Sequence, residues 1–280
     1  MEKYAIFTID VESFLDTECL KDKEVNEHLD MFDGLVNYLE LLDSYNIKAN
    51  LFVVADCIDK IKDILTKAIN NGHKLSIHGL HHTPALTISN EQFKREILEA
   101  KNILENTFNT KVLGYRAPCF SVNQERINSL KEIGLKFSSS FVNTSITYFG
   151  QTYNLDNYEK IEKQIYKDND FYEFEMPRVG PFPIGGGAYF RFLPYSLYMK
   201  HKIKKFIKKD SLYIFYLHPF EVSDCKIPKI KNLGSGEKMF LKVGKGKKYL
   251  NKVEKTIKLL IKNGYTMTTF EDLIEIIEKK

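Results

Sequence analysis

Short runs rich in β-branched and aromatic residues alternate along this chain with longer segments of helical periodicity. Strand-like runs occupy residues 4–9, 49–54 and 74–77. The segment between the first two has apolar residues at helical spacing, with Leu35, Leu39 and Leu42 on one face. Strands that alternate with helices of about 10 to 15 residues indicate βαβ units. The chain is therefore expected to form an α/β fold with a parallel sheet, open or closed into a barrel.

Local signals mark the ends of two expected helices. Asp56 is a good N-cap for a helix that runs to about residue 70, and Gly72 stands where a C′ glycine belongs. Ser89 is expected to cap a helix that runs to about residue 106, with Gln92 completing a capping box. The alternation continues with strands expected at 112–115, 135–139, 212–217 and 266–269, and with helices at 123–133 and 249–262.

The chain shows no repeat and no linker rich in Pro, Gly or Ser, which favours a single domain over residues 1–280. The segment at about 141–195 breaks the alternation, because it is rich in Tyr, Asn, Asp and Gly. We expect it to be an insertion between two strands. Loops at strand ends carry function more often than the strands do.

Composition narrows the class of protein. Among 280 residues, 41 basic and 37 acidic side chains leave a net charge of +4, too little to indicate nucleic-acid binding. The longest apolar run, at 212–217, has strand length, so no transmembrane segment is expected. The N-terminus, MEKYAIFTIDVES, has acidic residues where a signal peptide needs apolar ones. Four cysteines without CxxC spacing are expected to be reduced thiols, which favours a cytoplasmic protein.

Two clusters that follow expected strands have metal-site chemistry. Asp10 and Glu12 come directly after the first strand, so one carboxylate could bind a metal while the other accepts a proton from water. An acidic pair in this place is more often a helix cap or a solvated turn. His78 and His82 are four apart, and one turn of helix would put both on one face, whereas His81 would point elsewhere. Surface histidines in a loop are the alternative.

Two further clusters contain single polar residues after strands. Arg116 would need a carboxylate partner if buried, and Asp10 would suit it; a surface arginine before a turn is the alternative. Cys119 could be a metal ligand, although a buried apolar thiol is the commoner case. His218 is the right type of residue to protonate a leaving group, or it could be a hydrogen-bonded core histidine.

In this order, the clusters resemble the five motifs of the polysaccharide deacetylase superfamily (NodB homology, carbohydrate esterase family 4). The matching segments are FTIDVE, HGLHHTP, RAPCFS, FSSSF and YLHPFE, which together span residues 5–221. The chain is most similar to the intracellular, peptidoglycan-deacetylase-like branch, which also includes allantoinase- and imidase-like amide hydrolases. The resemblance implies a distorted (β/α)₇ barrel.

The resemblance also implies which residues bind a metal. Glu12 matches the metal-binding carboxylate, and His78 and His82 match the two metal histidines. Zinc is the expected divalent ion, and two nitrogen ligands with one oxygen ligand also admit cobalt, nickel, manganese or iron.

The remaining family positions imply roles in catalysis and substrate binding. Asp10 matches the catalytic base, Arg116 the residue that orients it, and His218 the general acid. The backbone N–H of Cys119 would bind the oxyanion. The segment PIGGGAYFRFLP resembles part of exopolysaccharide-cluster deacetylases and would line the substrate groove. Its expected substrate-binding residues are Gly186, Gly187 and Tyr189.

Two positions depart from the family pattern. Glu12 is one methylene longer than the usual Asp, so the metal would sit further from the strand or the loop would shift. Ser138 stands where relatives have an Asp that tunes the acid histidine. Either another acid, Glu173 or Glu175, takes that role, or His218 is a weakened acid.

The sequence therefore predicts a metal-dependent N-deacetylase that acts on an acetamido sugar of a surface-polysaccharide precursor, nucleotide-linked or lipid-linked. A small-molecule C–N hydrolase and a non-catalytic sugar-binding relative are the alternatives. A homo-oligomer is compatible with the sequence. The lysine-rich run at 200–209 is expected to be a solvated face, or else a contact with a phosphate-bearing donor or an anionic membrane.

Overall fold

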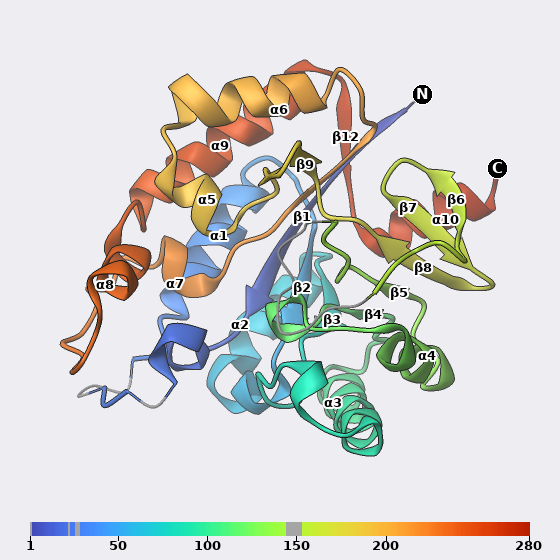
Figure 1. Cartoon of the computed structure of the whole chain (residues 1–280), viewed down its shortest axis with the longest axis horizontal. Helices are drawn as coiled ribbons and strands as arrows, with labels where there is room; N and C mark the ends of the chain where they lie inside the picture. The colour runs from blue at the N-terminus through green and yellow to red at the C-terminus, as the bar shows by residue number, and fades with distance from the viewer. Residues whose placement is uncertain (1, 22, 26–28, 144–152) are drawn as a thin grey trace.

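The computed structural model describes residues 2–21, 23–25, 29–143 and 153–280. Its main sheet is built around a row of parallel strands (Figure 1). In spatial order the seven strands are β11 (Leu212–Phe215), β1 (Lys3–Val11), β2 (Ala49–Val53), β3 (Lys74–Ile77), β4 (Gly114–Tyr115), β5 (Phe137–Ser138) and β8 (Phe171–Phe174). Every neighbouring pair in this row is parallel. On the free side of β11, Gly186 forms a single parallel bridge with Tyr216, so this side is irregular. The expected distorted (β/α)₇ barrel is confirmed.

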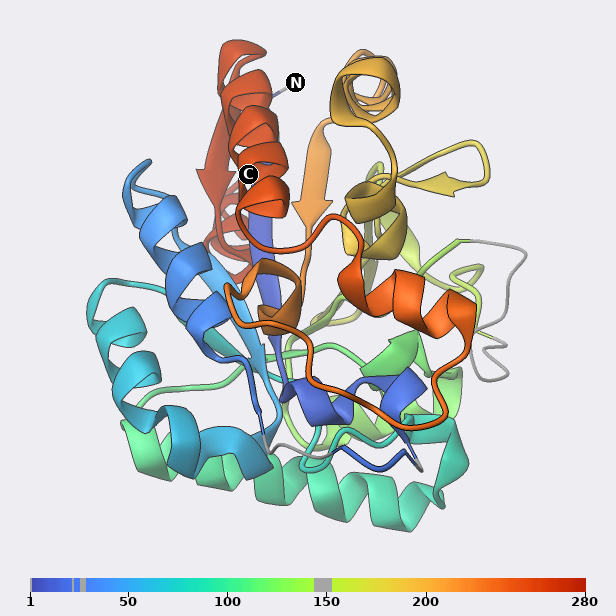
Figure 2. The ribbon, with the colours of Figure 1, turned by 90° about the vertical axis from the view of Figure 1, so that its left-hand side faces the viewer.

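Helices cover the outside of the sheet (Figures 1 and 2). The longer ones are α1 (Asp33–Asp43), α2 (Ile58–Asn70), α3 (Asn90–Phe108), α4 (Gln124–Glu132), α9 (Lys247–Lys262) and α10 (Phe270–Glu278). The shorter ones are α5 (Gly187–Phe192), α6 (Lys200–Phe206), α7 (Pro219–Val222) and α8 (Ser235–Lys242). Single turns of 3₁₀-helix lie at Phe14–Asp16, Glu18–Leu20, Ala55–Cys57, Ala85–Thr87 and Pro118–Phe120, and a π-helical turn at Tyr195–Met199 precedes α6. None of the helices in the described residues is long and apolar enough to cross a membrane.

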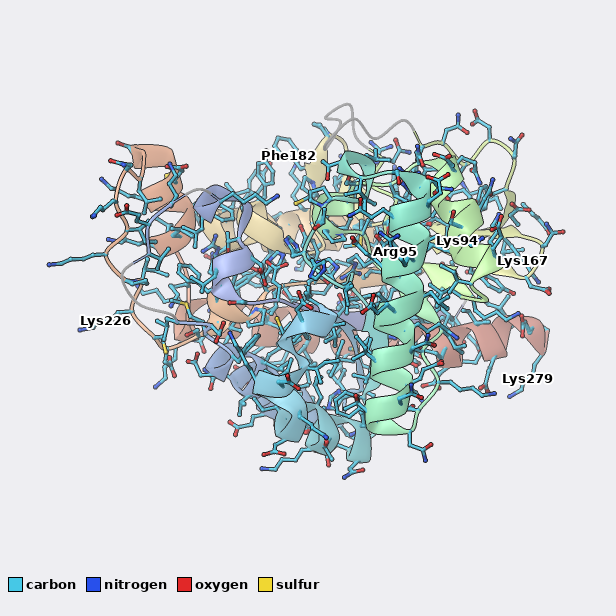
Figure 3. The ribbon with its side chains drawn as sticks, turned by 90° about the horizontal axis from the view of Figure 1, so that it is seen from below. Lys94, Arg95, Lys167, Phe182, Lys226 and Lys279 are labelled. Carbon is cyan, nitrogen blue, oxygen red and sulfur yellow. The ribbon has the colours of Figure 1, made fainter. Side chains whose placement is uncertain are left out.

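The amphipathic helix α3 illustrates how the outer layer packs. Phe93 and Ile97 are buried, whereas Lys94 and Arg95 are exposed on the opposite face (Figure 3). A helix with one apolar stripe buries that stripe against the sheet and leaves its charged face in water.

Strand β1 divides its side chains between two cores. Phe7 and Ile9 belong to the large cluster between the sheet and the helices, whereas Ile6 belongs to a second cluster inside the barrel. Successive side chains of a strand point to opposite faces. Thr8 and Asp10 therefore follow Ile6 on the inner side, which directs Asp10 into the barrel.

Most of the predicted elements and helix ends are confirmed, with boundaries shifted by a few residues. Gly72 has a φ of +94° just beyond α2, and the Ser89 hydroxyl accepts from the Gln92 backbone N–H. The Gln92 side chain donates to Glu96, so the capping box is only half formed. The prediction for Asp56 is wrong: α2 begins after Cys57 without a side-chain cap, and Asp56 contacts His81 instead.

The segment expected as an insertion supplies three strands of the main sheet, of which β8 continues the parallel row. Strand β8 pairs with β5, and β7 (Ile165–Asp168) and β6 (Glu159–Glu162) extend it in antiparallel order. A small hairpin, β9 (Arg178–Val179) and β10 (Phe182–Pro183), follows before α5. Part of the predicted insertion, residues 144–152, lies outside the described residues. Strand β12 (Tyr265–Thr268) pairs with the first half of β1 near the end of the chain.

Candidate active site

Three side chains from two strand ends meet inside the barrel. Glu12 follows β1, and His78 and His82 follow β3. One ligand atom from each lies within 4.8 Å of the others, and within the described chain this is the one group of its kind. Glu12 Oε2 is 2.7 Å from His82 Nε2 and 3.5 Å from His78 Nε2. The structure thus brings together all three predicted metal ligands.

The two histidines converge through a loop, which corrects the expectation of a helical turn between them. Residues 78–84 have no helical structure. Gly79 makes this path possible, because its φ is +106° and a Cβ there would lie 2.6 Å from the His81 carbonyl oxygen. His78 Nδ1 donates to the Arg116 carbonyl oxygen at 2.8 Å, which leaves Nε2 available for a metal. His81 points away and is half exposed beside Asp56, as predicted.

The electrostatics of the three residues suit a divalent cation. Burial by itself would raise the pKa of Glu12, but the charges of His82 and His218 and hydrogen bonds from the two neighbouring histidines hold it well below its usual range. The Oε2 atom of Glu12 is buried against the two imidazoles. An anionic oxygen and two imidazole nitrogens form a donor set that borderline-soft divalent ions accept. The residues present therefore fit a metal.

Asp10 and Arg116 form a buried ion pair beside the three ligands. Arg116 Nη1 donates to Asp10 Oδ1 at 2.7 Å, and it also donates to the Thr8 hydroxyl at 2.7 Å. The remaining guanidinium nitrogens donate to the backbone oxygen and hydroxyl of Ser139. The Phe52 ring lies 4.1 Å from the guanidinium carbon. Arg116 is thus held on several sides, and it holds Asp10 Oδ1 in turn. The other carboxylate oxygen, Asp10 Oδ2, faces His218.

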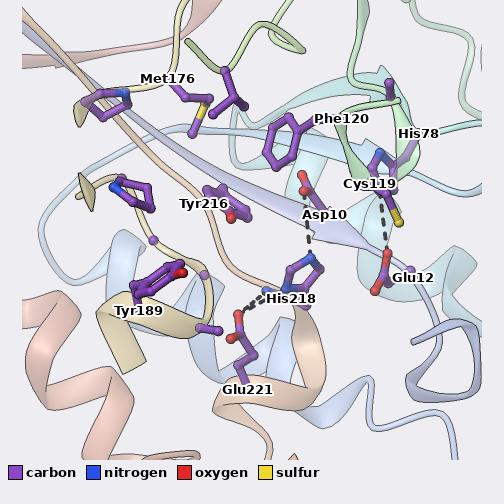
Figure 4. A pocket seen from close by; sticks show the side chains of 18 of the residues that line it. Asp10, Glu12, His78, Cys119, Phe120, Met176, Tyr189, Tyr216, His218 and Glu221 are labelled. Atoms are coloured by element: carbon purple, nitrogen blue, oxygen red, sulfur yellow. Dashed lines mark hydrogen bonds and ion pairs between the residues drawn. The ribbon is translucent and has the colours of Figure 1, made fainter. Parts of the chain in front are cut away.

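His218 stands on the other side of Asp10, at the N-terminus of α7 (Figure 4). Its Nε2 atom is 4.0 Å from Asp10 Oδ2, and its side chain is 23% exposed. The hydrogen bond from the Asp10 N–H to the Leu217 carbonyl, 2.9 Å long, sets this proximity. Burial lowers the pKa of His218, but the charges of Glu12, Glu221 and Asp10 and a hydrogen bond to Glu221 raise it to about 9. These neighbouring carboxylates therefore favour the protonated form of the imidazole.

Neither of the two acids expected to replace the missing Asp reaches His218. Glu173 accepts the backbone N–H groups of Ser140 and Phe141, at 2.9 and 3.0 Å. Glu175 accepts from Tyr166 at 2.9 Å and lies 3.8 Å from Arg178. Glu173 thus binds the loop after β5, and Glu175 binds residues of neighbouring strands. The prediction that one of them replaces the missing Asp beside His218 is wrong for both.

The carboxylate that contacts His218 is Glu221, which sequence reasoning missed. Glu221 Oε2 lies 3.1 Å from His218 Nδ1, and Glu221 Oε1 lies 3.1 Å from Arg191 Nε. Both Glu221 and Arg191 are buried. The signal was present in the fifth motif, YLHPFE, because a Glu three residues after a His at a helix start can fold back over it.

A cavity of about 360 Å³ opens onto these groups. The predicted substrate-binding residues Gly186, Gly187 and Tyr189 line it, and the Tyr189 side chain is 44% exposed. A Cβ at Gly186 would lie 1.8 Å from the Tyr216 carbonyl oxygen, at a φ of +129°, so this wall requires glycine. Other wall residues are mainly apolar: Phe120, Met176, Pro177, Pro181, Pro183 and Phe220.

Cys119 also lines the cavity, in a turn with left-handed backbone. Its φ is +53°, and that of Phe120 is +55°. The thiol is half-buried rather than fully buried, which corrects the expectation of a core cysteine, and it does not belong to the group of three ligands. The turn that follows Arg116 thus brings Cys119 to the cavity wall next to His78 (Figure 4).

A carboxylate, a histidine and a cluster of three possible metal ligands thus meet at the carboxyl ends of the barrel strands. The family model for polysaccharide deacetylases matches residues 32–138, and a model for a domain of unknown function, DUF3473, matches residues 139–274. Residues 32–138 therefore belong to the polysaccharide deacetylase (NodB homology, carbohydrate esterase family 4) superfamily. The boundary between the two matches falls at the end of β5, inside one continuous sheet.

Solved structures share the fold at low sequence identity. A protein from Mycobacterium smegmatis described as a polysaccharide deacetylase is 13% identical, with a TM-score of 0.65 over 99% of this chain and 91% of that one. The Bacillus subtilis family 4 carbohydrate esterase PdaA is 15% identical, with a TM-score of 0.52 over 100% and 82%. A family 4 pseudoenzyme from Bacillus anthracis is 11% identical, with a TM-score of 0.58 over 98% and 66%. No curated protein matches the chain.

Proposed function

We propose that the protein is a metal-dependent N-deacetylase that hydrolyses the acetamido group of a sugar in a surface-polysaccharide precursor. The observation that carries this proposal is the convergence of Asp10, His218 and the three ligand side chains on one cavity. Amide hydrolysis needs a base for the water, an acid for the departing amine and stabilisation of the oxyanion. The cavity contains a candidate for each.

The metal would be held by Glu12, His78 and His82. Zinc remains our first choice, with cobalt, nickel, manganese or iron as alternatives. When bound, such an ion polarises an amide carbonyl and lowers the pKa of a coordinated water.

The protein's own groups would move the protons. Asp10 Oδ2 accepts the proton of the attacking water, because Arg116 occupies Oδ1 and holds the carboxylate still. His218 donates a proton to the departing amine, since expulsion of an amide anion is otherwise prohibitive. The backbone N–H of Cys119 is proposed to hydrogen-bond to the oxyanion at the cavity wall.

A sugar is the proposed substrate because the mouth of the cavity carries an exposed aromatic ring. Tyr189 lines the cavity together with Gly186 and Gly187, and it is 44% exposed. The apolar face of a pyranose can pack against such a ring, while its acetamido group reaches toward Asp10. The proposal extends to a nucleotide-linked or lipid-linked precursor in the cytoplasm, in line with the intracellular branch that the sequence resembles.

Two other functions use the same residues. A small-molecule C–N hydrolase, of imidase or allantoinase type, would need the same acid, base and metal. A non-catalytic sugar-binding relative was suggested by Ser138, but the contact between Glu221 and His218 argues against it because the acid histidine keeps a carboxylate partner.

Acetate release from a panel of acetamido sugars tests the proposal. The metal-loaded protein should release acetate from at least one acetamido sugar, free, nucleotide-linked or lipid-linked, and chelation should stop it. Hydrolysis of cyclic imides or of allantoin without acetate release would support the small-molecule hydrolase. Sugar binding with stoichiometric metal but without any hydrolysis would support the non-catalytic relative.

Removal of one metal ligand should abolish metal binding. Purified protein is expected to contain close to one equivalent of divalent metal, and His78→Ala should lose it, because a carboxylate and one imidazole hold the ion far more weakly than three ligands. Elemental analysis after dialysis measures this. His81→Ala is the matched control, since His81 lies in the same loop but faces Asp56. Full metal retention in His78→Ala would reject the assignment.

A further inference from the structure

A buried row of charged groups stands behind His218. Arg191 Nε is 3.1 Å from Glu221 Oε1, and Glu221 Oε2 is 3.1 Å from His218 Nδ1. Arg191 is 0% exposed and Glu221 1% exposed. We propose that Glu221, held by Arg191, is the positioning residue of the acid histidine and takes the role left open by Ser138. The acid role of His218 rests on the proposed function, whereas the positioning of its ring does not.

The local backbone aims the Glu221 carboxylate at His218. His218 is the N-cap of α7, Pro219 is the first helical residue, and Glu221 is the third. Glu221 Oε2 accepts the His218 backbone N–H at 3.0 Å in addition to contacting the ring. A carboxylate at this position of a helix folds back over the helix start. The same atom therefore holds both the backbone and the imidazole of His218.

Arg191 comes from α5, in a distant part of the chain. The rings of Phe192, Phe220 and Phe240 surround its guanidinium at 5.1, 5.3 and 5.0 Å. None of its nitrogen atoms makes a well-aligned hydrogen bond to the described residues. An isolated buried charge is very costly, so the Glu221 carboxylate is the group that compensates it. Burial would raise the pKa of Glu221, but Arg191 and His218 outweigh burial and lower it.

The contact fixes which ring nitrogen faces the reaction. A carboxylate only accepts, so His218 Nδ1 carries the proton in this contact, and Nε2 faces Asp10 Oδ2. Nε2 is thus the nitrogen that can give a proton to a departing amine. The charged groups that face the ring are Asp10, Glu12 and Glu221, and the Tyr216 and Phe220 rings lie beside it. Glu221 contacts the ring directly and does not belong to the metal site.

The test compares Glu221→Gln with Glu175→Gln in the zinc-loaded protein. A glutamine oxygen can still accept the His218 backbone N–H, and a melting curve checks that Glu221→Gln remains folded although Arg191 loses its compensating charge. Nitrogen-15 NMR of the imidazole should show the His218 titration midpoint at least one pH unit lower in Glu221→Gln, together with a weaker preference for the Nδ1–H tautomer. Glu175→Gln is the matched control because it removes another buried carboxylate without touching His218.

Kinetics give the second readout. In Glu221→Gln, the high-pH limb of the pH profile of kcat for acetate release should move at least one pH unit toward acid. At pH 8, kcat should fall about tenfold or more, and KM should change less. Arg191→Met should shift the limb in the same direction. An unchanged His218 midpoint and tautomer in Glu221→Gln would overturn the proposal, and so would a loss of activity without any movement of the limb. If the NMR shift occurs but no substrate releases acetate, the positioning stands and the proposed function fails.

Discussion

The Asp10→Asn variant should hydrolyse the acetamido group roughly 10²–10⁴-fold more slowly than the wild type, at the limit of detection. Its metal content should stay at the wild-type level. Asp10 is the proposed proton acceptor, and an amide cannot take the proton from the attacking water. The metal should remain, because the ligands are Glu12 and the two histidines. The Asn oxygen can still accept from Arg116 Nη1, so the buried arginine keeps a partner and the fold should survive. Acetate release and elemental analysis on the same preparation measure both effects.

Glu12→Gln is the matched control for Asp10→Asn, because it changes the neighbouring carboxylate in the same way. It should lose metal as well as activity, since a neutral amide oxygen is a weaker ligand than a carboxylate. If Asp10→Asn lost as much metal as Glu12→Gln, the two carboxylates would have to share the metal or exchange roles. The melting temperature of both variants shows whether either loss reflects unfolding.

His218→Ala should lose turnover on an amide by roughly 10²–10⁴-fold and lose much less on an activated aryl ester. The departing amine needs a proton before the C–N bond can break, whereas an aryl oxide leaves without one. His218 Nε2 and Asp10 Oδ2 lie 4.0 Å apart and line the same cavity, so the proposed acid and base can both reach one amide group. Steady-state rates on an acetamido sugar and on an aryl acetate measure the difference.

The pH dependence of the wild type belongs to the same prediction. The pKa of His218 is raised from 6.5 to about 9, so the acid form is present at neutral pH and is lost as the pH rises. A bound divalent cation cancels the charge of Glu12, which contributes to that rise. The high-pH limb of the loaded enzyme should therefore lie between about 6.5 and 9. Equal losses of His218→Ala on amide and ester, with a lowered melting temperature, would instead make His218 a structural residue.

The fold was largely predictable because its elements are local. The alternation of strand and helix periods predicted the parallel sheet, and the observed ends differ by only a few residues. Two predictions were wrong because each depends on a contact with a distant part of the chain. Asp56 has the chemistry of an N-cap, but it contacts His81, a partner that no local pattern contains. The inclusion of β8 in the main sheet depends on its pairing with β5 across a long connection.

The residues of the candidate site were predictable, but the way they meet was not. His78 and His82 were chosen from a spacing that fits a helix, and a loop bent at Gly79 brings them together instead. Asp10 and Arg116 were paired correctly because a buried guanidinium requires a carboxylate. Motif order could identify these residues, since parallel strands bring their carboxyl ends to one face of a barrel.

The sequence by itself determined which side chains stand at the strand ends, because residue type and strand period are properties of neighbouring positions. Only the tertiary structure decided which carboxylate serves His218. Glu173 and Glu175 were the candidates named from the sequence, yet their carboxylates bind other partners. Arg191 and Glu221 are 30 positions apart in the sequence. Their contact forms because aromatic rings from α5, α7 and α8 exclude water around the guanidinium, which leaves the carboxylate as its compensating charge.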